Sequence, residues 1–358
     1  MKNGLKIQRI LEANPLSWKD VLTNPPYSLK INEDENLVIF NYDMIRSDKS
    51  NKAVQEARGL ILEKNTWEIV CHPFNKFFNY GESNAHVINW KNAVVQEKID
   101  GSLIKVYFYK KWRVATNGTI NAFNAPVQSD LYNGTFGDLF VKAFSKYMDF
   151  KNLNENICYF FELVSPYTRI VIPYSETDIY FLGQRNRRTD EEEYGEFTNF
   201  KRPEIYPINS IEDCLKAAEI LPYDKEGYVV VDNKFHRVKV KSPAYLAEHH
   251  LKNNGSLTKK RIIDLIKIGR DDDFIGKFPE FKEDIEKVRN SYRNFIISMD
   301  KSFEEIKGKS FADRKSFALA VKDTKNPAFF FQWYDGKVKN FEEYVNNSLD
   351  SEDIAKII

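Results

Sequence analysis

The sequence has 358 residues, of which 53 are Lys or Arg and 52 are Asp or Glu, so its formal net charge is only +1. This length predicts two domains, and the charge balance excludes binding of a polyanion through a basic field over the whole surface. Any such ligand would need a local cluster of cations. The three cysteines show no C-x-x-C spacing, which argues against a disulfide framework or a structural zinc site. No apolar run reaches transmembrane length and the first residues lack a signal-peptide pattern, so we expect a soluble protein of a reducing compartment, with no membrane partner.

The first eighty residues predict one helix and then several strands. The helix is expected at 6–13, a strand at 37–42, and a hairpin from the runs 57–63 and 67–70. Arg58 lies just before a glycine in this hairpin, and taken alone it reads as a surface arginine. Lys76 stands among aromatic residues within 74–81; such a cluster is typical of a core, yet it could also stack a purine beside a cation.

The stretch 96–102 has the strongest chemical content, because it combines a lysine, an acid and a Gly-Ser turn before the apolar run 103–108. In a strand, residues i and i+2 share a face, so Lys98 and Asp100 are expected to point into one site. A lysine amine is nucleophilic only when deprotonated, and its ordinary pKa of about 10.4 makes that rare at neutral pH. Desolvation and neighbouring cations favour the neutral amine. The competing interpretation is a solvated lysine beside a turn.

The middle of the chain predicts alternating strands and helices, and one strand carries an acid. The strand at 157–163 is strongly apolar apart from Glu162, and the charged run 185–193 is expected to be a solvated turn. The other predicted elements are a strand at 112–118, a helix at 135–148, strands at 169–172 and 179–182, and a helix at 211–221.

Two linked strands follow, at 225–231 and 236–242. Glu226 stands at the entrance of the first. In the second, lysine alternates with valine, so Lys239 and Lys241 share one face and the valines the other. Taken alone, this alternation favours an exposed edge strand, whose lysines prevent aggregation.

Beyond residue 243 the pattern becomes helical, with amphipathic segments at about 258–268, 279–306, 311–322 and 339–346. We therefore expect a domain boundary near residue 243. The sequence contains no G-x-x-x-x-G-K-[ST] motif, which argues against a P-loop kinase.

Considered together and in order, these signals resemble the motifs of the covalent nucleotidyltransferase superfamily of polynucleotide ligases and capping enzymes. The aromatic block around Lys76 and the segments after Glu162 and Lys239 resemble more closely the RNA ligase 1 family of T-even-type phages. The matching segments are Arg58-Gly59, Lys76-Phe77-Phe78-Asn79, Lys98-x-Asp100-Gly101-Ser102, Glu162-Leu163-Val164-Ser165-Pro166 with 169–172, Glu226-Gly227 and Lys239-Val240-Lys241-Ser242.

The resemblance implies an α+β fold with two parts. Residues 1–243 would form a nucleotidyltransferase (adenylation) domain of antiparallel sheets with flanking helices. Residues 244–358 would form an all-helical RNA-specificity domain, although this tail matches the family only loosely.

The resemblance also implies an ATP-dependent RNA ligase that joins RNA 5′-phosphate and 3′-hydroxyl ends through a lysyl-AMP on Lys98 and an RNA-adenylate. Glu226 and Glu162 would hold Mg²⁺ or Mn²⁺, or Glu162 would contact the ribose instead. The implied catalytic residues are Lys98, Asp100, Lys239 and Lys241. The implied ATP-binding residues are Tyr42, Arg58, Lys76, Phe78 (or Phe77), Glu97, Lys98, Gly101, Glu162, Glu226, Lys239 and Lys241.

One position departs from the family pattern. Asn117 stands where the family usually has a lysine, which puts one phosphate contact in doubt. The implied partner is RNA, with nicked tRNA as one candidate, and the protein would be a cytoplasmic monomer, in the host cytoplasm if phage-encoded. Two alternatives stay open: a DNA ligase or capping guanylyltransferase, and an RNA-binding protein on a ligase scaffold that has lost its chemistry.

Overall fold

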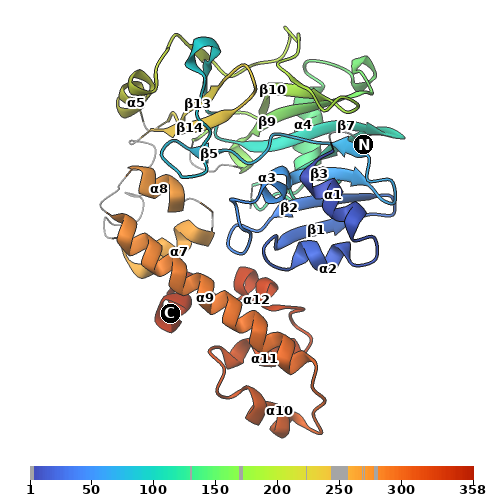
Figure 1. Ribbon diagram of the computed structural model, residues 1–358, viewed down its shortest axis with the longest axis vertical. Helices are drawn as coiled ribbons and strands as arrows, with labels where there is room; N and C mark the ends of the chain where they lie inside the picture. Colours follow the sequence, from blue (N-terminus) through green and yellow to red (C-terminus); the bar gives the residue numbers. More distant parts are fainter. Residues whose placement is uncertain are drawn as a thin grey trace. The chain divides into compact units, whose positions relative to one another are not determined.

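The computed structural model describes residues 4–129, 131–168, 172–222, 224–242, 257–267, 269, 271–277 and 281–358 (Figure 1). The chain forms two compact units, unit 1 (Met1–Asn253) and unit 2 (Asn254–Ile358). The boundary predicted near residue 243 lies outside the described residues and stays a prediction. Within the described part of the chain, no helix combines the length and apolar character needed to span a bilayer.

The described residues confirm the α+β prediction, with antiparallel sheets and flanking helices in unit 1 and a helical C-terminal region. Three sheets contain the strands of unit 1, and the pairing of β14 with β5 is parallel. The N-terminal sheet has the order β1 (Leu29–Glu33), β2 (Leu37–Tyr42), β3 (Arg58–Glu63), β4 (Ile69–Cys71). The central sheet has the order β11 (Glu192–Glu193), β10 (Asp178–Asn186), β9 (Ile157–Val164), β7 (Ser102–Tyr109), β8 (Lys111–Ala115). The third sheet has the order β12 (Ile205–Tyr206), β6 (Val94–Glu97), β13 (Gly227–Val231), β14 (Arg237–Lys241), β5 (Phe78–Asn79).

The N-terminal sheet is buried on both faces, which explains its nearly continuous apolar strands. Val38 and Phe40 of β2 pack into a core with the first three helices, whereas Leu37 and Ile39 pack against the central sheet. These helices are α1 (Lys6–Ala13), α2 (Trp18–Thr23) and α3 (Lys52–Glu56). The order of layers is therefore helices, N-terminal sheet and central sheet.

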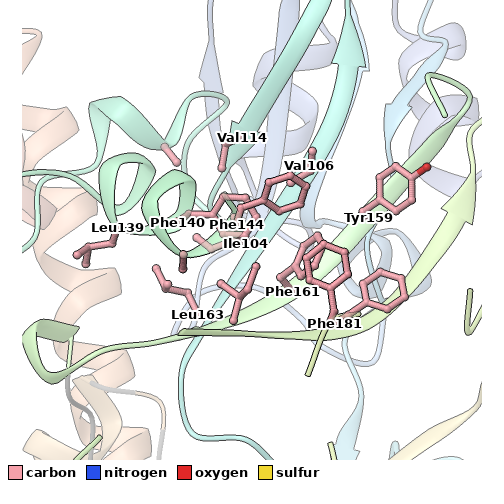
Figure 2. Packing of buried hydrophobic residues seen from close by; sticks show 14 of the residues in the cluster. Ile104, Val106, Val114, Leu139, Phe140, Phe144, Tyr159, Phe161, Leu163 and Phe181 are labelled. Carbon is pink, nitrogen blue, oxygen red and sulfur yellow. The ribbon is translucent and has the colours of Figure 1, made fainter. Parts of the chain in front are cut away.

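The far face of the central sheet packs on helix α4 (Phe136–Phe144), and Figure 2 shows this core. Phe161 lies near the edge of the rings of Phe140 and Phe144, with centroid distances of 5.4 and 5.8 Å. Edge-to-face contacts of this kind add to the stabilisation from burial. Thr135 begins α4 with a capping box, because it accepts from the Asp138 amide and Asp138 bonds back to Thr135.

The third sheet packs one face on helix α5 (Ile211–Glu219). Val238 and Val240 of β14 lie in that core with Cys214 and Ala218, so Lys239 and Lys241 occupy the opposite face. The predicted segregation of lysine from valine is correct. The edge-strand interpretation is wrong, because β14 lies between β13 and β5.

One further expectation differs in part from the structure, and another is not tested by it. The turn expected in the run 185–193 is present at 187–189, where Arg188 and Thr189 are exposed. Arg185 of β10 and Glu192 of β11 are however ion-paired and mostly buried, so the run is not solvated throughout. Residues 169–171 of the strand predicted at 169–172 lie outside the described residues. The sequence also left β1, α2 and α3 unpredicted.

Unit 2 contains only helices among its described elements. The longest, α9 (Lys282–Lys307), buries residues at spacings of three and four, including Tyr292, Phe295, Met299 and Phe303. The other helices are α7 (Lys259–Lys267), α8 (Asp271–Lys277), α10 (Arg314–Val321), α11 (Pro327–Tyr334), α12 (Phe341–Asn347) and α13 (Ser351–Ile357). Short 3-10 turns lie in unit 1 at Trp90–Asn92, Ala122–Asn124, Phe150–Asn152 and Pro166–Thr168.

Candidate active site

Lys98 lies where the chain crosses from the third sheet to the central sheet. Strand β6 ends at Glu97 and β7 begins at Ser102, so the residues between them form a connection. The Lys98 amide donates to the carbonyl of Gly227 at 2.8 Å, which fixes this connection against β13. The Lys98 amine donates to Glu226 Oε2 at 2.7 Å, and its side chain is 20% exposed. The amine is therefore held in place yet reachable.

Glu226 joins two lysines through its two oxygens. While Oε2 binds Lys98, Oε1 lies 2.7 Å from the Lys241 amine, and the Glu226 side chain is 1% exposed. The following residue allows this approach: Gly227 has φ +137°, and a Cβ there would lie 2.7 Å from the Lys241 Cα. A buried carboxylate with two cations is a charge-dense centre that a buried site tolerates only because the charges are paired.

Glu162 provides a second carboxylate near this centre. It lies on β9 opposite Leu103 of β7. Burial raises the pKa of Glu162 to about 7, because it disfavours the charged carboxylate. The charges of Lys98 and Arg58 act against this rise, and that of Glu226 adds to it.

The connection after Lys98 corrects the expectation that Lys98 and Asp100 share one strand face. Residues 98–101 are not a strand, and the Asp100 carboxylate, 3% exposed, accepts from the Ile172 amide at 3.0 Å. Asp100 thus anchors the turn to another segment. Gly101 packs tightly against β9, since a Cβ there would lie 2.9 Å from the Glu162 Cγ.

Aromatic rings and cations alternate beside the lysine pair. The amine of Lys76, a residue that is 9% exposed, lies 4.6 Å from the ring centre of Phe78 and 5.4 Å from that of Tyr42. Phe77 contacts two cations, with Arg58 at 5.2 Å and Lys239 at 5.3 Å from its ring centre. These distances allow cation–π attraction.

The parallel pairing of β5 with β14 brings the aromatic block to the lysine strand. Lys239 is opposite Asn79 and Val238 is opposite Phe78. This pairing joins segments that are far apart in the sequence. Glu97, predicted to contact ATP, forms an ion pair with Lys225 at 2.6 Å.

Three buried polar atoms in this region have no hydrogen-bond partner among the described residues. They are Arg58 Nη1, Asn79 Oδ1 and Asn117 Oδ1. Asn117 and Arg58 are close, since a Cβ on Gly59 would lie 3.0 Å from the Asn117 Cα. Buried polar atoms are normally satisfied, so these atoms mark a place where a polar ligand would be stabilised.

The structure also reveals a buried lysine that the sequence analysis did not identify. Lys105 on β7 is 0% exposed, and its amine donates to the Gly59 carbonyl at 2.6 Å. Gly59 directly follows Arg58, so this bond holds the start of β3 in place. The only sequence signal was a lysine within the apolar run 103–108.

The two carboxylates suit a divalent cation only in part. Among the described residues no group of three His, Cys, Asp or Glu side chains is arranged as a metal site. However, Mg²⁺ in nucleotide sites commonly takes one or two carboxylates together with substrate phosphates. The raised pKa of Glu162 fits this use, because a cation would stabilise its charged form.

The comparisons with known proteins agree on a family. A family profile described as RNA ligase matches residues 56–245, which is more than half of the chain. One relative is a protein of Autographa californica nuclear polyhedrosis virus that is named as a bifunctional polynucleotide kinase/RNA ligase. It is 33% identical over 286 residues, and the match covers 73% of this chain and 40% of that protein. The chain thus spans less than half the length of this relative. An RNA ligase of Rhodothermus phage RM378 is 25% identical, covering 80% of this chain and 82% of the phage protein.

The similarity to solved structures is weaker. An archaeal ATP-dependent RNA ligase is 12% identical with a TM-score of 0.45, covering 89% of each chain. A Naegleria gruberi RNA ligase solved with ATP and Mn is 15% identical with a TM-score of 0.33, covering 44% of this chain and 52% of that one. On the match of the family profile, the chain belongs to the RNA ligase family.

Proposed function

We propose that this protein is an ATP-dependent RNA ligase whose nucleophile is Lys98. The observation that carries the proposal is the buried Glu226 carboxylate shared by Lys98 and Lys241 at 2.7 Å each. A lysine held in place by an acid, with a second lysine beside it, is suited to covalent catalysis, because the amine is positioned for attack and a cation is available for the phosphate charge.

In the first step the Lys98 nitrogen attacks the α-phosphorus of ATP. A nitrogen–phosphorus bond forms, the bond from the α-phosphorus to the bridging oxygen breaks, pyrophosphate leaves with the bonding electron pair, and the proton of the amine passes to water. Lys239 and Lys241 stabilise the charge on the α-phosphate oxygens. Asp100 and Gly101 fix the turn that presents the amine.

The remaining residues bind and orient the nucleotide. Arg58 and Lys76 meet the phosphates, and the unpartnered Arg58 Nη1 supports this role. Phe78 and Tyr42, whose rings both lie near the Lys76 amine, form part of the adenosine pocket. Glu97, at the end of β6, orients the nucleotide. Glu162 and Glu226 would hold Mg²⁺ or Mn²⁺, which would neutralise charge on the phosphates.

The later steps use RNA. The adenylyl group passes to an RNA 5′-phosphate, and an RNA 3′-hydroxyl then displaces AMP to form the phosphodiester. Nicked tRNA is one substrate of this kind. The proposal includes action as a monomer in the cytoplasm, and selection of the RNA by unit 2.

The alternatives have less support. DNA ligases and capping enzymes of this superfamily would be expected to continue into a β-rich domain, whereas every described element after residue 242 is a helix. A scaffold without chemistry would not need to keep Lys98, Glu226 and Lys241 in contact.

The test is incubation with α-³²P-labelled ATP or GTP and a divalent metal, followed by a denaturing gel. We expect a labelled protein band with ATP alone. Lys98→Ala should abolish the label but retain part of the sealing of chemically pre-adenylated RNA, since the last step does not use this amine. Lys111→Ala is the matched control, because Lys111 is exposed at the start of β8, an edge strand of the central sheet.

Covalent AMP on the Lys98→Ala variant would refute the assignment of the nucleophile. Labelling by GTP would indicate capping instead. If neither nucleotide labels the protein, even after pyrophosphate treatment to remove AMP already bound, the scaffold interpretation would hold.

A further inference from the structure

A cavity of about 400 Å³ in unit 1 adjoins the candidate active site. It is lined by α3, by the segment before β5, by the ends of β10 and β11, and by the turn between β13 and β14. Lys76 and Phe77 belong both to this lining and to the active site. We call it the basic cavity. Its volume lies within the range of small-molecule and nucleotide-sized pockets.

The acids of the basic cavity already have ion-pair or hydrogen-bond partners within the protein. Glu192 is ion-paired with both Arg185 and Arg237. Asp190 lies 2.8 Å from the Nδ1 of the buried His72. Glu56 accepts the Lys6 and Ile7 amides at the start of α1. None of these carboxylates forms a described ion pair with a lysine of the cavity.

Three lysines of the basic cavity have no acidic partner among the described residues. Lys52 and Lys234 are exposed, Lys76 is 9% exposed with its amine beside the rings of Phe78 and Tyr42, and none of the three forms a described ion pair. A lysine that is mostly removed from water and has no described acidic partner attracts negative charge, so an anionic ligand at Lys76 would be stabilised. The cavity thus has an excess of positive charge at its rim and at its inner end.

The basic cavity also offers flat faces for stacking. Phe77 and Phe235 line it, and the rings of His86 and His236 stack at 4.4 Å with an angle of 14° between their planes. A combination of cations and aromatic rings is typical of sites for single-stranded nucleic acid, where bases stack and lysines follow the backbone. A free pyrophosphate needs the cations but none of these rings.

We infer that the basic cavity binds phosphate groups and bases of the single-stranded RNA whose 5′ end is activated at Lys98. The continuity through Lys76 and Phe77 gives such a strand a path to the reacting centre. This inference deepens the proposed function and rests on it for the identity of the strand.

The test compares two double charge reversals in the full chain. Lys52→Glu with Lys234→Glu changes the rim of the basic cavity. Lys111→Glu with Lys142→Glu is the matched control, since both lysines are exposed and lie on β8 and α4, away from the cavity lining. Affinity is measured by fluorescence anisotropy with a short single-stranded 5′-phosphorylated RNA over a series of salt concentrations. Labelling by ATP is measured in parallel.

We expect the rim variant to weaken RNA binding by about tenfold and to lower the salt slope by about 1.4, since each single-strand phosphate contact contributes about 0.7. Lysyl-AMP formation should stay within about twofold of the unmodified protein, and the control should bind RNA normally.

Unchanged RNA affinity and salt slope in the rim variant would overturn the inference. If the variant instead needed more ATP for labelling while RNA binding was unchanged, the basic cavity would belong to the leaving pyrophosphate, which also overturns it. Because anisotropy needs no catalysis, its result stands even if the unmodified protein fails to label, and that failure would count against the proposed function alone.

Discussion

Glu226 compensates the positive charges of two lysines in the candidate active site. Its carboxylate is buried and bonded to Lys98 and Lys241 through separate oxygens. Removing one partner of a buried ionic group leaves the others uncompensated, which costs about 3 to 5 kcal/mol in known cases. The same residue therefore affects both stability and the position of the nucleophile.

We predict that Glu226→Gln lowers the initial rate of lysyl-AMP formation by at least about 100-fold, because a neutral amide cannot balance both lysines. Glu226→Ala should also lower the free energy of unfolding by about 3 kcal/mol. Labelling by ATP measures the first effect and denaturant unfolding the second. Glu204→Gln is the control, since Glu204 is exposed and its side chain accepts from the Tyr206 hydroxyl, with no ion pair among the described residues. A Glu226→Gln variant that labels at the normal rate would contradict this reading.

The role of Glu162, as a metal ligand or as a contact to the ribose, can be decided by experiment. Its carboxylate is electrostatically coupled to Glu226, which is expected of two acids that would share a cation. We predict that chelation abolishes labelling and that Glu162→Gln raises the Mn²⁺ concentration for half-maximal labelling by at least about tenfold. The measurement is a metal titration at saturating ATP. A normal metal requirement with a higher ATP requirement would instead assign Glu162 to the ribose.

At the scale of elements, strand β7 places a lysine, Lys105, in the buried interface between the central and N-terminal sheets. Lys105 points to the side of Leu103 and Tyr107, which pack against the N-terminal sheet. Burial lowers the pKa of Lys105 to about 8, since desolvation penalises the ammonium, and the charge of Arg58 adds to this fall. The thiols of Cys71 and Cys158 act in the opposite direction.

This pKa makes stability depend on pH. In the unfolded chain the Lys105 amine has its ordinary pKa near 10.5, so between pH 8 and 10.5 the unfolded chain binds more protons than the folded one. Stability therefore rises with pH in this window, and below pH 8 the cost of the buried charge is constant. Relative to Lys105→Met, the free energy of unfolding of the unmodified protein should rise by about 3 kcal/mol across the window.

Denaturant unfolding at several pH values tests this, and taking the difference between the two proteins removes most other titrations. Lys142→Met, on the surface of α4, should show no such change in the difference. A difference that stays flat from pH 8 to 10.5 would mean that Lys105 is not a titrating buried amine.

The local pattern within a strand could be predicted from the sequence, whereas its pairing with distant segments could not. The alternation in β14 predicted which face carries Lys239 and Lys241, because the strand period is local information. It could not predict that β14 is interior, since its neighbour β5 lies about 160 residues earlier in the chain. The burial of Glu192 within the run 185–193 could not be predicted either, because its partner Arg237 lies 45 residues later in the sequence. The strand face expected to be shared by Lys98 and Asp100 is not found, because an irregular connection and not a strand follows Lys98.

At the scale of the whole molecule, chemistry and helical structure separate along the chain. Every residue proposed to act on ATP lies between Tyr42 and Lys241, within unit 1. Unit 2 has its own core, in which Phe303 and Phe341 contact Phe329 of α11 at ring-centre distances of 5.2 and 4.9 Å. Separate cores are what independently folding units require.

We therefore predict that a chain ending at Asn253 still forms lysyl-AMP, at a rate within a few fold of the full chain, because the nucleophile, its carboxylate and the phosphate-binding cations are all retained. Sealing of RNA should fall much more than labelling if unit 2 selects the RNA. Both activities are measured on the same preparations, with circular dichroism to establish that the shortened chain is folded. A folded chain that no longer labels would show that unit 2 takes part in the nucleotide chemistry, and a chain that seals RNA normally would remove the substrate role proposed for unit 2.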